Sequence, residues 1–482
     1  MYSGSVFSPA FVFFEEFGDY CHKNHPGDIS LNASTLVRTG VVGPRRNHRS
    51  RWPREGLRRR GGLEWVFLRS ALRRAALASG LPNSSVSLLC LFPFNRADYD
   101  DLVLPFVKGV ADAGGRCAAV VPGPAMKRWG DHAHRDGFEV HPLDAGPNLT
   151  VYLEARRTLE ALRPGLEDVA NRFALGRGAR TGLAAYFTQF AFQKALAARF
   201  LARLAPTVVL GIHFVYSRGW QAAIRDAPCS TSRPTVILVQ HGALEVADEF
   251  HDFDGADVVM LWGERWRREL LAYPTREFLP KPKAVVTGNP KYDDMTRVVA
   301  QASLRPTRPV EGRRVLFVSG HENGRTKLAP LKMAIAAASQ DRGFDLIVKP
   351  HPASRDGVLA GFVNRGNLLS GAVLPGSHPI QDGVRDADIV IGPESTTLFE
   401  AVRIGRPVVL LSESPSQAFE GFLTASDASG LHRHLEALAD DQAWRDRVLE
   451  RQRLVLEDAI GRSSGAVAAG VDLIRSYLRQ AD

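Results

Sequence analysis

From Ser85 onward, short apolar runs alternate with longer segments whose apolar positions recur at helical spacing. Short apolar runs bounded by turn residues are typical of buried strands, and the longer periodic segments are typical of amphipathic helices. Near-continuous apolar strands separated by helices indicate a parallel sheet that is covered on both faces. The pattern therefore predicts an α/β fold built from doubly wound, Rossmann-like parallel sheets.

The elements fall into two series, which predict two such sheets in tandem. In the first series we expect strands at Val86–Phe92, Arg116–Val121, Thr207–Ile212, Thr235–Gln240, Asp257–Trp262 and Lys283–Thr287, with helices at Tyr99–Ala113, Tyr152–Phe173 and Ala184–Leu204. In the second series we expect strands at Val315–Ser319, Asp345–Lys349, Asp388–Gly392 and Pro407–Leu411, with helices at Leu328–Ser339, Ser395–Ile404, Ser429–Ala459 and Ser463–Gln480.

The length of 482 residues also exceeds what one hydrophobic core usually supports. The polar stretch between the two series carries Pro306 and Pro309 and predicts a linker. We expect a leader at residues 1–80, a first domain at 81–290, a linker at 291–311 and a second domain at 312–482. Two doubly wound domains in tandem imply a cleft between the carboxyl ends of their strands.

The net charge of +9 belongs to one segment of the leader. Between Arg45 and Arg74 there are eleven arginines against two glutamates, an excess equal to the net charge of the whole chain. The folded domains are therefore neutral, which excludes a nucleic-acid-binding face on them. Within this segment, Glu64–Leu77 has the spacing of an amphipathic helix that could bind an anionic membrane surface; the alternative is a disordered leader, as the aperiodic residues 1–60 indicate.

Composition indicates a cytoplasmic protein, which the basic segment 45–74 could hold at the inner face of the cell membrane. No run of about 18 apolar residues is present, and the first residues lack the basic start and apolar core of a secretory signal. The cysteines are scattered without a CxxC pair, which argues against a zinc site and fits a reducing compartment. They are Cys21, Cys90, Cys117 and Cys229.

Loops that follow predicted strands carry the candidate chemistry. After Thr235–Gln240 comes His241, followed by Gly242. A neutral imidazole at this place could take the proton of an acceptor hydroxyl, and the alternative is a histidine that stabilises the next turn. His213 ends another predicted strand and could line the same edge or belong to the core.

Two loops of the second series offer groups to a phosphate. Ser319 and Gly320 lie in a Ser/Gly-rich turn whose backbone N–H groups could bind an anion. In Lys349-Pro350-His351-Pro352 two prolines restrict the backbone around the histidine. A fixed His351 beside Lys349 could bind a monophosphate or a diphosphate.

The last loop begins a helix. Ser395 and Thr396 stand where Ser395–Ile404 starts, so their hydroxyls and the free N–H groups of the first turn could bind an anion. Glu400 is placed to accept two ribose hydroxyls. The alternatives are a plain N-cap for Ser395 and a solvated helix residue for Glu400.

Taken in order, the QHG, GNPKYD, KPHP and ESTT segments resemble the GT-B superfamily of glycosyltransferases. Within it the chain is similar to the CDP-glycerol glycerophosphotransferases of teichoic acid synthesis and to capsule polysaccharide transferases, including bacterial polysialyltransferases. The resemblance covers about Val86 to Ser476. It implies a transferase that moves a group from a nucleotide-activated sugar or polyol to a glycan or lipid-linked acceptor of the cell surface, without a bound metal or other cofactor.

The resemblance also implies roles for individual residues. His241 matches a proposed base, His351 a histidine that contacts the donor phosphates, Ser395 and Thr396 the paired hydroxyls that hold the same phosphates, and Glu400 a glutamate on the donor ribose. The segments around QHG and before ESTT depart from the glycerophosphotransferases, which leaves the donor open. Two alternatives remain: a non-hydrolysing UDP-sugar 2-epimerase, which SGHENG faintly resembles, and a non-catalytic GT-B-like binding protein.

Overall fold

The computed structural model describes most of the two predicted domains. The predicted leader, its basic segment 45–74 and residues 294–311 of the predicted linker lie outside the described residues, apart from four leader positions. The described residues are 20–21, 23–24, 85–95, 97–143, 149–214, 217–227, 233–242, 253, 255–272, 281–293, 313–322, 325–326, 328–340, 344–351, 358–368, 372–376, 378–415, 419–461 and 464–480.

The first lobe is built on a sheet of seven parallel strands in the order β3-β2-β1-β4-β5-β6-β7. This is the doubly wound order, in which the chain first builds one half of the sheet and then crosses to the other side of β1. The strands are short, and the five inner ones are almost entirely buried because helices cover both faces, whereas the edge strands β3 and β7 are mostly half-buried. The strands are β1 (Leu88–Leu91), β2 (Cys117–Val121), β3 (Glu139–Pro142), β4 (Val208–Gly211), β5 (Thr235–Val239), β6 (Val258–Leu261) and β7 (Lys283–Val286).

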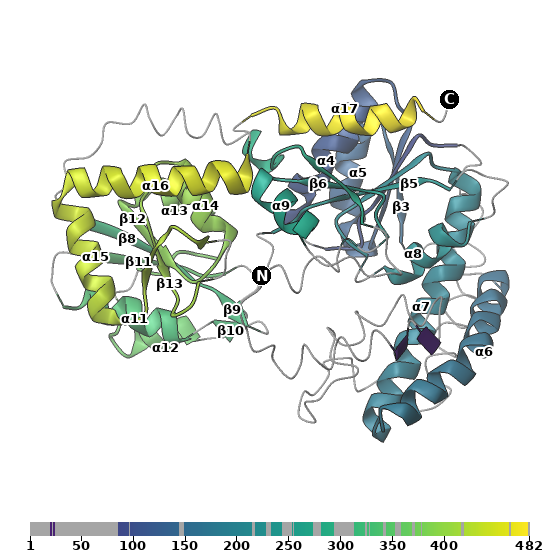
Figure 1. Ribbon diagram of the computed structural model, residues 1–482, viewed down its shortest axis with the longest axis horizontal. Helices are drawn as coiled ribbons and strands as arrows, with labels where there is room; N and C mark the ends of the chain where they lie inside the picture. The colour runs from purple at the N-terminus through teal and green to yellow at the C-terminus, as the bar shows by residue number, and fades with distance from the viewer. Residues whose placement is uncertain are drawn as a thin grey trace.

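The helices predicted at Tyr152–Phe173 and Ala184–Leu204 are present as α6 and α7, whereas α5 was not predicted. A long hairpin, α6 with α7, extends away from the sheet (Figure 1). The remaining helices pack against the strands. The helices are α4 (Ala97–Asp112), η1 (Gly123–Ala125), α5 (Met126–Asp136), α6 (Leu149–Arg172), α7 (Arg177–Leu204), α8 (Arg218–Arg225) and α9 (Glu264–Ala272).

The second lobe is built on five parallel strands in the order β11-β8-β12-β13-β14. Val373 adds a single parallel bridge to Val348 beyond β11, so this sheet repeats the doubly wound order of the first one. The tandem α/β architecture predicted from the sequence is confirmed. The strands are β8 (Arg313–Val318), β11 (Phe344–Lys349), β12 (Ile389–Gly392), β13 (Val408–Leu411) and β14 (Leu423–Ala425); a separate antiparallel pair joins β9 (His321–Glu322) to β10 (Arg325–Thr326).

Three helices of the second lobe follow the prediction, whereas α12 and α13 were not predicted and one predicted helix is divided in two. The segment that we predicted as one helix, Ser429–Ala459, is two helices, because the Asp441 carboxylate accepts a hydrogen bond from Trp444 N–H and begins a new helix there. The helices are α11 (Leu328–Ala338), α12 (Val358–Asn364), α13 (Ile380–Asp386), α14 (Thr396–Arg403), α15 (Ala428–Asp440), α16 (Gln442–Ile460) and α17 (Ala466–Leu478).

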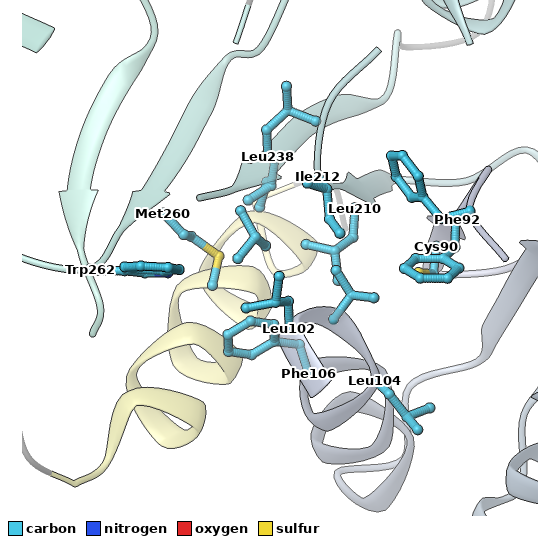
Figure 2. Packing of buried hydrophobic residues seen from close by; sticks show 14 of the residues in the cluster. Cys90, Phe92, Leu102, Leu104, Phe106, Leu210, Ile212, Leu238, Met260 and Trp262 are labelled. Atoms are coloured by element: carbon cyan, nitrogen blue, oxygen red, sulfur yellow. The ribbon is translucent and has the colours of Figure 1, made fainter. Parts of the chain in front are cut away.

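The last helix returns to the first lobe. Although α17 lies within the predicted second domain by sequence, it packs beside α4 under the first sheet (Figure 2), and Gly470 lies directly against Phe106 and Met260. Its start is capped by Asp293, whose carboxylate accepts hydrogen bonds from the N–H groups of Ala466 and Val467. Asp293, in the segment that follows β7, therefore anchors the start of α17 to the first lobe.

The end of α16 makes a second close contact with the first lobe. The Trp266 indole N–H donates to the Ala459 carbonyl, and the backbones of Gly263 and Gly461 pass so closely that neither position has room for a Cβ. Gly461 also has a φ of 68°, which favours glycine. No helix in the described part of the chain is both long and apolar enough to cross a bilayer.

Candidate functional site

The predicted phosphate-binding residues of the second lobe follow three neighbouring strands. Ser319 comes after β8, Pro350 and His351 after β11, and Ser395 after β12, and β8 lies between the other two. Because parallel strands end at the same edge of a sheet, these loops share the carboxyl edge of the second lobe. The gap between β8 and β12 is where the chain reverses its direction of winding, the usual ligand site of such sheets.

Ser319 connects two of these loops. It is 2% exposed, and its hydroxyl accepts a hydrogen bond of 2.8 Å from the backbone N–H of His351. The Ser319 N–H in turn donates to the Lys349 carbonyl at 3.0 Å. The half-buried His351 is thus fixed in position by the strand next to its own, a link that the sequence alone did not indicate.

Lys349 has a different place from the one that the sequence suggested. Only 4% of it is exposed, and its ammonium donates to the carbonyls of Gly376 at 2.9 Å and Pro350 at 3.3 Å. Burial lowers the pKa of this amine. The side chain that we predicted to bind phosphate therefore holds the segment 372–376 against the end of β11, and it reaches a ligand at most with its third N–H.

Ser395 is the N-cap of α14. Its hydroxyl accepts a hydrogen bond of 3.3 Å from Thr397 N–H, which is the structural alternative considered above. The Thr396 N–H has no such acceptor within the helix, and the positive end of the helix dipole lies at the sheet edge. Gly392 allows this approach, because a Cβ there would lie 2.7 Å from the Val318 carbonyl of β8. The arrangement can bind an anion at the start of α14.

Glu400 lies further along α14, against the segment that leaves the first sheet. Burial raises the pKa of its half-buried carboxyl to about 7, while the positive charge of Lys291 acts in the opposite direction. Its Oε2 is shielded from solvent and makes no hydrogen bond within the described part of the chain. Beside it, the Arg403 guanidinium lies 5.2 Å from the ring of Tyr292, which is 1% exposed. The GNPKYD segment thus brings first-lobe residues to α14.

The first lobe presents a cluster of four rings at the carboxyl edge of its sheet. Phe94 follows β1, His213 follows β4, His241 follows β5, and Tyr99 is on α4. The ring centroids are 4.9 Å apart for Phe94 and His213, 5.0 Å for His213 and His241, 5.8 Å for His241 and Tyr99, and 5.3 Å for Tyr99 and Phe94. The structure therefore places His213, which the sequence left open, beside the predicted base.

Gln240 fixes the turn that carries His241. Its side chain is fully buried; the amide donates to the Gly242 carbonyl at 2.8 Å, and the amide oxygen accepts from Trp262 N–H at 2.9 Å. The turn after β5 is therefore tied to the end of β6. A histidine held on a fixed turn at a strand end is suited to proton transfer.

Two groups at these edges were missed by sequence reasoning. The pairing of His213 with His241 depends on β4 and β5 being neighbours, and the only available signal was that both residues follow strands. Lys291 was quoted within GNPKYD but was given no role. Its proximity to Glu400 arises from tertiary structure.

Comparison with known proteins gives a distant likeness. No protein-family model matches the chain. A curated relative is the UDP-N-acetylglucosamine–N-acetylmuramyl-(pentapeptide) pyrophosphoryl-undecaprenol N-acetylglucosamine transferase of Bacillus licheniformis, 24% identical over 183 residues, or 37% of this chain and 49% of the relative. The chain thus matches about half the length of that curated relative.

Solved structures match over most of the chain. A UDP-GlcNAc 2-epimerase from Neisseria meningitidis aligns with a TM-score of 0.50 and 12% identity over 82% of this chain and 99% of its own. A wall teichoic acid polymerase aligns with a TM-score of 0.46 and 8% identity over 87% and 96% of the two chains. Together with the two sheets, the first likeness confirms the GT-B fold that the sequence resemblance implied.

Proposed function

We propose that the protein is a GT-B transferase that moves a sugar, or a polyol phosphate, from a nucleotide-activated donor to a cell-surface polysaccharide or a lipid-linked acceptor. The observation that carries this proposal is the meeting of His351, Ser319 and the start of α14 at the switch point of the second sheet. Imidazole, hydroxyl and helix N-terminal N–H groups are the donors that a diphosphate requires.

The donor nucleotide would occupy the second lobe. His351, the Gly320 backbone, Thr396 and the N–H groups of the first turn of α14 stabilise the charge that develops on the leaving phosphate. Lys349 and Ser319 hold the loops that carry these groups. The Glu400 carboxylate accepts hydrogen bonds from the ribose hydroxyls, which would satisfy its buried Oε2.

The acceptor would approach the first lobe near His241. As the acceptor oxygen forms its bond to the donor, the bond from the donor to the phosphate oxygen breaks, and the electron pair stays on the departing nucleotide. His241 takes the proton of the acceptor hydroxyl. Closure of the lobes would exclude water, which would otherwise hydrolyse the donor.

Support for a nucleotide sugar comes from the curated relative, which is a UDP-N-acetylglucosamine-dependent transferase with a lipid-linked acceptor. We therefore rank UDP-N-acetylglucosamine first among donors and a polyprenyl-diphosphate-linked sugar first among acceptors. The finer expectations, a role in capsule or teichoic acid synthesis and attachment of a cytoplasmic enzyme to the membrane through residues 45–74, belong to this proposal.

A thermal-shift screen against CMP, CDP, UDP, GDP and their sugars tests the donor site. A ligand present at 100 times its Kd adds about 2.7 kcal/mol to stability and raises the Tm. His351→Ala should abolish the shift while leaving the Tm of the free protein nearly unchanged. Transfer is then measured with the donor that binds and a panel of lipid-linked and glycan acceptors. If no nucleotide shifts the Tm and no donor is consumed, the proposal fails.

A second candidate function is epimerisation of a UDP-sugar, because the fold matches that of a UDP-GlcNAc 2-epimerase over 82% of the chain. The two functions differ in their need for an acceptor. Incubation with UDP-N-acetylglucosamine alone, followed by proton NMR, reveals the C2 epimer only if the chain is an epimerase. Incorporation of solvent deuterium at C2 would support that function in the same experiment, since inversion there requires proton exchange.

A further inference from the structure

His213 and His241 lie side by side at the carboxyl edge of the first sheet, after the neighbouring strands β4 and β5. Their ring centroids are 5.0 Å apart and their planes are inclined at 65°, an edge-to-face arrangement. His213 is only 7% exposed, and Phe94 packs against its other side at 4.9 Å with an angle of 82°. His241 is half-buried and has Tyr99 as its further neighbour. The buried ring of His213 therefore supports one flank of the more accessible ring.

This geometry restricts the orientation of His241. A terminal imidazole torsion is normally broad, so a histidine on a turn would sample many ring orientations. Here the edge-to-face contacts with His213 and Tyr99 favour one of them, because the positive edge of one ring meets the negative face of the next. The turn itself is fixed by Gln240. Backbone and side chain are thus both held before an acceptor arrives.

The same contact makes the two rings electrostatically dependent. A proton on one imidazole keeps an attractive edge-to-face contact, because a cation at the face of a neutral ring is stabilised. A second proton puts two positive charges about 5 Å apart in a site that is partly closed to water, and these repel. Two protonated rings at this distance are therefore disfavoured, and the contact is strongest when at least one ring is neutral.

We propose that His213 is the positioning residue for His241: its buried ring packs edge-to-face against the His241 ring and holds it in the orientation in which it can accept the proton of the acceptor hydroxyl. This inference rests on the proposed function of His241 as a base. It adds that the base is one half of a two-histidine unit, with Phe94 and Tyr99 as its packing partners.

Histidine NMR tests the pair without reference to any reaction. In protein labelled at the imidazole Cε1 carbon, the His213 and His241 signals are assigned through His213→Phe and His241→Phe variants. We expect the two signals to move in separate pH ranges in the native protein. Each signal should follow a simple single-site curve, at a changed pH, when the other histidine is replaced. Two independent curves that are unaffected by the partner substitution would overturn the proposal.

Kinetics with the accepted donor and acceptor provide the second test. His213→Phe keeps an aromatic ring against His241 and should retain most of kcat. His213→Ala removes this support, and kcat should fall about tenfold with the donor KM within twofold of the native value. His134→Phe, at an exposed site near the end of α5, is the matched control.

The two hypotheses fail in different ways. If His241→Ala abolishes transfer while His213→Ala keeps the native kcat, the proposed base stands and the two-histidine unit is overturned. If the NMR coupling is present but His241→Ala transfers normally, the pairing stands and the proposed function of His241 is overturned. Should His213→Ala fold poorly by circular dichroism, His213→Phe and His213→Gln decide the matter.

Discussion

The backbone N–H of His351 donates to the hydroxyl of Ser319 over 2.8 Å and so joins the loop after β11 to the loop after β8. Replacing Ser319 by Ala removes this acceptor from a backbone group in a half-buried loop, which costs about 1 to 2 kcal/mol. We expect a lower free energy of unfolding in urea and a severalfold higher donor KM, because His351 loses its fixed position.

Ser339→Ala is the control for that variant. The Ser339 hydroxyl also bonds to backbone, at the Ile335 carbonyl, but on the exposed end of α11. The Ser339→Ala variant should leave the donor KM unchanged and should change the free energy of unfolding by no more than about 0.5 kcal/mol. An unchanged donor KM in Ser319→Ala would separate Ser319 from donor binding.

Ser395→Ala should damage both stability and donor binding. Loss of an N-cap hydrogen bond costs about 1 kcal/mol, and the first turn of α14 would fray at the point where we propose that phosphate binds. Asp441→Ala removes the equivalent cap from α16, which begins directly after α15. Thermal unfolding should show a similar loss for the two variants, whereas only Ser395→Ala should raise the donor KM.

Stability should depend on pH through Glu400. Burial raises the pKa of this carboxyl from 4.5 to about 7, so the folded protein binds the proton more tightly than the unfolded chain. Its contribution to folding is therefore complete below about pH 4.5 and is lost as the pH rises to about 7. Above that pH, Glu400→Gln should be more stable than the native protein by on the order of 2 kcal/mol, a figure reduced for partial exposure.

Urea titrations of both proteins at several pH values between 4.5 and 8 measure that difference. A difference in free energy of unfolding that stays constant across this pH range would contradict a raised pKa of Glu400. Donor binding should show the opposite trend, because only the ionised carboxylate accepts hydrogen bonds from both ribose hydroxyls. The donor KM of the native protein should fall as the pH rises through about 7, and that of Glu400→Gln should not.

The contact between Gly263 and Gly461 should tolerate no side chain. A Cβ would lie 2.3 Å from the Asp458 carbonyl at position 263 and 2.7 Å from the Trp262 carbonyl at position 461. Each Gly→Ala substitution should cost at least about 2 kcal/mol, measured by urea unfolding. Gly130→Ala is the control: nothing lies near its Cβ, and in the α5 interior alanine should stabilise the helix by up to about 1 kcal/mol.

The sequence predicted most strands of both sheets, because buried parallel strands are nearly continuous apolar runs. It missed α5 and β3 in the first lobe, and α12, α13 and β14 in the second. In Met126–Asp136 only Trp129 and Ala133 are buried, which is too weak a helical period to recognise. β3 is a short edge strand, Glu139–Pro142, with only one buried residue. Sequence periodicity does not reveal a helix or strand that buries few of its residues.

The sequence named candidate positions at strand ends but could not indicate their contacts. Loops at strand ends could be found because strands could be found. The sequence could not indicate that the Lys349 ammonium turns to the carbonyl of Gly376, since the two are 27 residues apart and meet only in the folded sheet. His213 and His241 are likewise neighbours because β4 and β5 are adjacent in the sheet, and this strand order was not predicted.

Asp293 caps α17, and so the two places where the chain passes between the lobes are bound to each other. One passage leaves β7 through residues 287–293, and the other returns at residues 461–466. Because both passages are joined at one point, we expect the lobes to rotate about a single hinge beside the Gly263–Gly461 contact rather than to slide past each other. Substrates would then enter and leave from the side opposite that hinge, and a change at Asp293 would alter opening rates without touching either binding edge.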